Sequence, residues 1–183
     1  MIRTIIAIVG MPGAGRTVVS KMFEEKGFYR IRFGDITDNE LKKRAMGRTE
    51  ENERFVRESL RVEYGPAAYA KMSLVKIKKA ASVSKNIVID GLYSLEEFMF
   101  LRKKFPELVM MAVLASPEIR HERLIKLENN PFTLEECVFR DISMLENLKL
   151  GGPICLADYF AVNEGNLSDL RKSADKIFEK LIK

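Results

Sequence analysis

The sequence predicts an α/β fold in three layers, with a five-stranded parallel sheet between two layers of helices. Short apolar runs recur along the chain, as expected of strands that are buried on both faces. Helical stretches lie between these runs, and alternating strands and helices favour right-handed parallel connections. A glycine-rich segment follows the first apolar run. With 183 residues, of which 46% are hydrophobic, the chain predicts a single domain over residues 1–183.

The predicted strands are short and apolar throughout. The first spans 4–9 and a weaker candidate spans 28–33, followed by 87–90, 109–114 and 159–162. No apolar run approaches the length that a membrane span needs, and the first run leads straight into glycines rather than into a cleavage site. We therefore expect a cytoplasmic protein without a membrane segment.

Helix starts are marked by a hydroxyl residue followed three positions later by glutamate, the capping-box pattern. This pattern occurs at Thr37–Glu40, Ser94–Glu97 and Thr133–Glu136. Ser116 followed by Pro117 is another predicted start, because proline is favoured at the first helical position.

Two stretches interrupt the alternation of strand and helix. Residues from about 35 to 84 are helical in pattern throughout. Residues from about 126 to 153 are highly charged and end in Gly151-Gly152-Pro153, which predicts a loop. Both stretches are expected to be insertions over the carboxyl edge of the sheet, where α/β proteins bind ligands.

The glycine-rich segment at residues 10–17 lies between an apolar strand and a predicted helix. Glycines let the backbone turn so that N–H groups point at phosphate oxygens, and the helix N-terminus adds partial positive charge. This is the context that a phosphate-binding loop (P-loop, or Walker A motif) requires. ATP is therefore expected to bind through Gly10, Met11, Pro12, Gly13, Ala14, Gly15, Arg16, Thr17 and Val18.

Arg16 stands where a P-loop normally carries a lysine that reaches the terminal phosphates. Arginine keeps the charge but is longer, planar and forked, so the exchange affects catalysis more than binding. Thr17 supplies the hydroxyl expected on Mg²⁺, and Asp90 at a strand end could hold the water shell of that ion. The alternative for Asp90 is a polar turn residue before Gly91.

These features resemble the nucleotide-kinase branch of P-loop proteins, and specifically an adenylate-kinase-related or dephospho-CoA-kinase-like family that is chiefly archaeal. The resemblance covers nearly the whole chain. It depends on a series of segments in this order: G-x-P-G-x-G-[KR]-T at 10–17, Gly34-Asp35, Val88-Ile89-Asp90-Gly91 with Ser94, Ser116-Pro117-Glu118-Ile119-Arg120 with Arg123, Arg140-Asp141, and Ala157-Asp158-Tyr159 leading to Asn163 and Gly165.

The resemblance implies transfer of the γ-phosphoryl group of MgATP to a small nucleotide-like acceptor, either dephospho-CoA or a nucleoside monophosphate. It also implies a helical substrate-binding insertion at about 35–84, a lid region at about 118–153, and Asn163 beside the adenine. The catalytic residues are expected to be Arg16, Asp35, Arg120, Arg123 and Arg140. The acceptor is expected to contact Gly34, Asp35, Asp90 and Gly91.

Two of these assignments have structural alternatives. Arg120 and Arg123 are three residues apart and share one helical face, and Arg140 follows on the next helix. These arginines could clamp the phosphoryl group or form a solvated basic face. Asp35 could be the base for a hydroxyl acceptor, or it could be a turn or cap residue.

Besides Arg16, the sequence departs from the family at two places. Residues 36–38 stand where the family usually has an arginine, and residues 127–130 stand where its lid usually carries an R-x-R-like segment. Loss of one such positive donor can cost roughly 10² to 10³ in rate. We therefore expect a slow kinase, and Asp35 without the nearby arginine favours a hydroxyl acceptor. The alternative is a nucleotide-binding regulatory protein without significant turnover.

The charge and cysteine content exclude other classes of site. The net charge of +5 suits a polyanionic ligand, but basic and acidic residues are interleaved, so nucleotide phosphates are favoured over nucleic acid. The two cysteines form no C-x-x-C pair, which argues against a disulfide framework and against a thiolate zinc site.

Overall fold

The computed structural model describes residues 4–83, 86–128 and 131–182. A five-stranded parallel sheet in the order β2-β3-β1-β4-β5 forms its centre. The strands are β1 (Thr4–Val9), β2 (Tyr29–Arg32), β3 (Asn86–Asp90), β4 (Leu108–Leu114) and β5 (Tyr159–Val162). All five predicted strands are confirmed. Because β1 is the middle strand, the glycine segment that follows it lies at the centre of the sheet edge.

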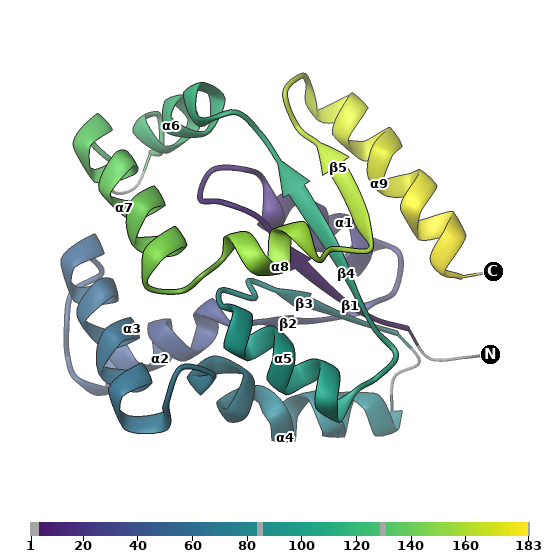
Figure 1. The fold of residues 1–183 in the computed structure, drawn as a ribbon, viewed down its shortest axis with the longest axis horizontal. Helices are drawn as coiled ribbons and strands as arrows, with labels where there is room; N and C mark the ends of the chain where they lie inside the picture. Colours follow the sequence, from purple (N-terminus) through teal and green to yellow (C-terminus); the bar gives the residue numbers. More distant parts are fainter. Residues whose placement is uncertain (1–3, 84–85, 129–130, 183) are drawn as a thin grey trace.

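Helices cover both faces of the sheet, as the sequence predicts (Figure 1). One face packs against α1 (Arg16–Glu25) and α9 (Leu167–Leu181), and the other packs mainly against α4 (Ala68–Val83) and α5 (Leu95–Lys104). Successive residues of β1 alternate between these two cores, which explains why the strand sequence is apolar throughout.

The two stretches that interrupt the alternation form additional helices. The first contains α2 (Gly34–Lys43) and α3 (Glu50–Tyr64) before α4. The second contains α6 (Pro117–Ile125), α7 (Leu134–Glu146) and α8 (Gly151–Cys155). In Figure 1, α2, α3, α6 and α7 lie beyond the end of the sheet toward which the strands run. Asn129 and Asn130, part of the predicted lid segment, lie outside the described residues.

Two helix boundaries differ from the prediction. Thr37 does not start a helix but lies inside α2, because its hydroxyl hydrogen-bonds to Tyr69 Oη at 2.6 Å in the core. Gly151-Gly152-Pro153 begins α8 instead of forming a loop, since a first helical turn tolerates proline. The starts at Ser94 and Thr133 are confirmed, and both hydroxyls accept a backbone hydrogen bond from the glutamate three residues later.

Across the three described segments, no helix combines the length and the apolar character needed to cross a membrane.

Candidate functional site

The glycine segment forms a tight loop between β1 and α1. Gly13 and Gly15 have positive φ angles of 77° and 103°. A Cβ on Gly13 would lie 2.5 Å from the backbone oxygen of Arg120, and one on Gly15 would lie 2.5 Å from the side-chain nitrogen of Asn163. Only glycine permits both this backbone conformation and these close approaches.

Side chains outside the loop donate hydrogen bonds to the backbone carbonyl groups of three consecutive loop residues. The pairs are Arg120 Nη1 with the Pro12 oxygen at 3.1 Å, Arg123 Nη1 with the Gly13 oxygen at 3.4 Å, and Asn163 Nδ2 with the Ala14 oxygen at 2.8 Å. Asn163 and Arg123 are also joined, since Arg123 Nη2 donates to the Asn163 backbone oxygen at 2.9 Å. These contacts fix the peptide planes of the loop before any phosphate binds.

Arg120 connects the loop to helix α7. Arg120 is 4% exposed, and its side chain donates two hydrogen bonds to Asp141, at 2.8 and 2.7 Å. His121 Nε2 lies 2.9 Å from the same carboxylate. Burial raises the pKa of Asp141, but the hydrogen bonds to Arg120 and His121 outweigh burial and hold that pKa below its ordinary value. The alternative of a solvated basic face is therefore wrong for Arg120.

Thr17 and Asp90, the two predicted magnesium residues, lie side by side. Thr17 is exposed, and its hydroxyl donates to Asp90 Oδ1 at 3.4 Å. Asp90 is 3% exposed, and its Oδ2 accepts hydrogen bonds from Arg30 Nε at 3.1 Å and Nη2 at 2.5 Å. An accessible hydroxyl beside a buried carboxylate is a pair of oxygen groups that would suit Mg²⁺.

Arg16 extends from the start of α1 along the wall of a cavity. Its Cζ lies 5.0 Å from the centroid of the Tyr93 ring. Its Nη1 is buried and has no hydrogen-bond partner among the described residues. A buried donor without a partner lowers the stability of the folded protein, so the position of this cation fits a site in which a bound anionic group accepts its hydrogen bond. The loop and Arg16 together fit a phosphate group.

The loop opens onto a cavity of about 700 Å³. Pro12, Gly13, Arg16 and Thr17 line one end of it. Arginines from several elements line the rest, and these are Arg32, Arg48, Arg57 and Arg140. Three carboxylates accompany them, from Asp38, Glu50 and Glu53. The acceptor end of the cavity therefore carries both positive and negative side chains.

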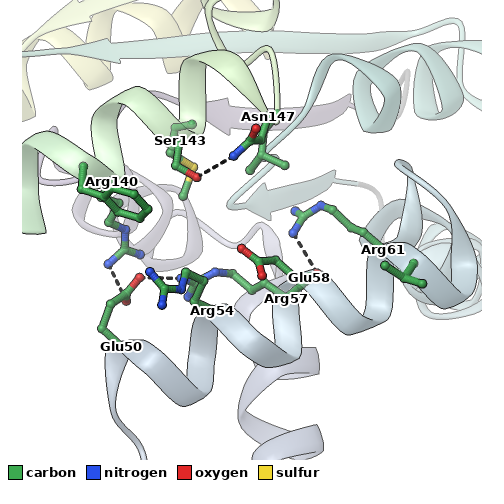
Figure 2. Close-up of a pocket in the computed structure, with 12 residues that line it drawn as sticks. Glu50, Arg54, Arg57, Glu58, Arg61, Arg140, Ser143 and Asn147 are labelled. Atoms are coloured by element: carbon green, nitrogen blue, oxygen red, sulfur yellow. Dashed lines mark hydrogen bonds and ion pairs between the residues drawn. The ribbon is translucent and has the colours of Figure 1, made fainter.

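Each of these four arginines is paired with a carboxylate. In Figure 2, Arg140 of α7 and Glu50 of α3 point toward one another, with Arg140 Nη1 3.0 Å from Glu50 Oε2. Arg57 Nη2 donates to the other oxygen of Glu50 at 2.6 Å. Burial lowers the pKa of Arg140, and Glu50 opposes that effect. The remaining pairs are Arg32 with Asp38 at 2.5 Å and Arg48 with Glu53 at 3.1 Å.

The predicted acceptor residues are only partly brought together. Gly34 lines the cavity, whereas Asp35 is not a lining residue. The Asp35 carboxylate is 46% exposed and lies 3.0 Å from Arg32 and 3.8 Å from Lys76. Asp38, one turn later in α2, lines the cavity instead.

Sequence reasoning missed Arg32, Arg48, Arg57, Asp38 and Tyr93. Arg57 follows Glu53 by four residues, a spacing that indicates only support of its own helix, and it does contact Glu53 at 3.2 Å. The others belong to no motif, so local spacing contained no signal for them.

Glu97 supports the site from the core. Its Oε2 accepts a hydrogen bond from the backbone N–H of Tyr93 at 2.9 Å, and its side chain is fully buried. Burial raises the pKa of Glu97 to about 7, although Arg61, 3.6 Å away, lowers it.

We expect the pKa of Glu97 to make folding weaker as pH rises. The folded pKa of about 7 exceeds the ordinary value of 4.5, so the unfolded chain releases this proton first. The stability that the folded state gains from the protonated Glu97 carboxyl is fully present below pH 4.5. It is lost as pH rises to about 7, a change on the order of 3 kcal/mol in the free energy of unfolding. Urea denaturation across this range would measure it. A Glu97→Gln variant should lack this part of the pH dependence, and an unchanged profile would contradict the assignment.

Comparison with known proteins gives one matching family and several similar proteins. A family described as "AAA domain" matches residues 6–137. A UPF0200 protein of Thermococcus sibiricus is 35% identical over 181 residues, covering 97% of this chain and 95% of that protein. A UPF0200 protein of Staphylothermus marinus is 36% identical over 180 residues, covering 97% and 93%.

Two solved structures have a similar fold. Shikimate kinase from Bacteroides thetaiotaomicron matches with a TM-score of 0.63 and 15% identity, over 98% of this chain and 99% of that one. A gluconokinase from Sinorhizobium meliloti matches with a TM-score of 0.58 and 15% identity, over 98% and 96%. At these identities the likeness shows the fold alone, which is that of P-loop kinases.

Proposed function

Since this chain belongs to the AAA domain family and to the UPF0200 proteins, we propose that it transfers the γ-phosphoryl group of MgATP to a small nucleotide-like acceptor. The observation that carries the proposal is Arg16, which lines the arginine-rich cavity and whose buried Nη1 has no hydrogen-bond partner among the described residues. Phosphoryl transfer depends mainly on positioning and on neutralising charge, and this arrangement supplies both.

The residues of the loop would divide the work of binding MgATP. The N–H groups of the loop and of the start of α1 would hold the phosphates, and Asn163 would border the adenine. Arg16 would contact the terminal phosphate. Thr17 and Asp90 would hold Mg²⁺, which when bound neutralises charge on the phosphates.

The arginines of the cavity favour an acceptor that carries an anionic group. A hydroxyl acceptor needs a free carboxylate base within reach, but Asp35 lies outside the cavity lining. The carboxylates that do line the cavity, those of Asp38, Glu50 and Glu53, are each held by an arginine. A phosphate acceptor instead needs paired cations, and Arg57 and Arg140 are placed on facing helices. We therefore favour a nucleoside monophosphate over the ribose hydroxyl of dephospho-CoA, which reverses the preference drawn from the sequence.

The test is a coupled assay with MgATP and four acceptors: AMP, CMP, UMP and dephospho-CoA. We expect turnover of a monophosphate, and we expect Arg140→Met to lower kcat by about 100-fold, because it removes a cation from the acceptor end. Calorimetry should show MgATP affinity unchanged in this variant. Arg171→Met is the matched control, since Arg171 makes an exposed pair with Glu25 on α1, at 3.0 Å.

A second candidate is a nucleotide-binding regulatory protein without significant turnover. The observation that favours it is that the arginines of the acceptor end already have carboxylate partners within the chain. Tight MgATP binding with no product from any of the four acceptors would support this candidate and contradict the kinase.

A further inference from the structure

Tyr93 lies against the guanidinium group of Arg16 on the cavity wall. The distance of 5.0 Å from Arg16 Cζ to the ring centroid is within the range of a cation–π contact. A planar guanidinium can lie over an aromatic ring and keep its N–H groups available, whereas an ammonium is a compact point charge. The Nη1 of Arg16 is buried and unpaired in the described structure, so the ring supports the cation without using this donor.

Three features of the structure position Tyr93. Its backbone N–H donates to Glu97 at 2.9 Å. Its ring packs edge-to-face against Tyr69, with centroids 6.0 Å apart and planes at 68°. Gly91 has a φ of 91°, and a Cβ there would lie 2.9 Å from Tyr93 Oη, so glycine makes room for the ring. A support that is ordered before the ligand arrives reduces the entropy lost on binding.

Arginine in the lysine position of the loop needs such a support. Its rotamer freedom is similar to that of lysine, but its planar guanidinium must also be oriented, which a compact ammonium does not require. The stem of Arg16 passes beside Gly10, where an added Cβ would lie 3.4 Å from Arg16 Cγ. The ring of Tyr93 then meets the guanidinium at the far end, so the side chain is guided along its length.

We propose that Tyr93 is a positioning residue that holds the Arg16 guanidinium beside the phosphate loop, and that this contact allows arginine to replace lysine there. The proposal rests on the proposed binding of MgATP. Its distinctive consequence is coupling: the contribution of Tyr93 to nucleotide binding depends on residue 16 being arginine.

A double-mutant cycle measured by titration calorimetry with MgATP tests this coupling. We expect Tyr93→Leu to weaken MgATP binding about tenfold in the native background, and less than about twofold in the Arg16→Lys background. Tyr93→Phe retains the ring and should bind within about twofold of the native protein. Tyr29→Leu, an exposed tyrosine in β2, is the control for loss of a ring elsewhere.

Several results would overturn the proposal. These are an equal loss from Tyr93→Leu in both backgrounds, a loss in Tyr93→Phe as large as in Tyr93→Leu, and tighter binding by Arg16→Lys than by the native protein.

A second measurement needs no nucleotide. The δ-methylene protons of Arg16 should show an upfield ring-current shift in the NMR spectrum of the native protein and of Tyr93→Phe. The shift should be lost in Tyr93→Leu. Its absence from the native protein would overturn the positioning role. Failure of the native protein to bind MgATP would instead overturn the proposed function, and the shift would still decide whether Tyr93 holds Arg16.

Discussion

Replacing Gly13 with alanine is expected to weaken MgATP binding by about 100-fold or more. Gly13 has a φ of 77°, and an added Cβ would lie 2.5 Å from the oxygen and 3.0 Å from the carbon of the Arg120 backbone. These atoms belong to the backbone of helix α6, whose hydrogen bonds would have to break before they could move, so the loop itself must shift. A displacement of about 1 Å is enough to cost roughly 100-fold where N–H groups must meet phosphate. Titration calorimetry with MgATP measures the effect.

Two glycines outside the loop provide matched controls for this substitution. Gly27 has a φ of 90° but nothing within 4 Å of an added Cβ, so Gly27→Ala has the backbone strain without the clash. Gly47→Ala has open space and no positive φ, so it should be neutral. Both variants should bind MgATP like the native protein. If Gly13→Ala also bound normally, the loop would not be the nucleotide site.

Replacing Arg120 with methionine is expected to lower both stability and MgATP affinity. The change removes the arginine that binds both oxygens of the Asp141 carboxylate, whose side chain is only 14% exposed. Breaking a buried ion pair in this way typically costs about 3 to 5 kcal/mol of stability. It also removes the donor to the Pro12 carbonyl, which frees one peptide plane of the loop. Urea denaturation and calorimetry would measure the two effects separately.

A double variant separates stability from nucleotide binding. In Arg120→Met with Asp141→Leu, no carboxylate is left unpaired, so most of the lost stability should return. The Pro12 carbonyl still lacks its donor, so MgATP affinity should remain low. Full recovery of affinity along with stability would mean that Arg120 affects the loop only through folding, and the predicted role as a phosphoryl clamp would then also be contradicted.

Most of the architecture was predictable because its signals are local. The five strands, the glycine loop and the helix starts at Ser94, Ser116 and Thr133 depend on short stretches whose spacing determines hydrogen bonding within a few residues. The resemblance to P-loop kinases is likewise confirmed. The exception at Thr37 has a tertiary cause, because Tyr69 takes the hydroxyl that would otherwise have capped a helix.

The sequence by itself determined the loop, the strand order along the chain and the residues that border the candidate magnesium site. Only the tertiary structure decided which charges meet. Asp90 pairs with Arg30, and Arg120 binds both Asp141 and the Pro12 carbonyl of the loop. Arg140 of α7 pairs with Glu50 of α3. The physical reason is that backbone conformation responds to near neighbours, whereas the partner of a long charged side chain is whichever opposite charge the packing of distant elements brings within about 4 Å.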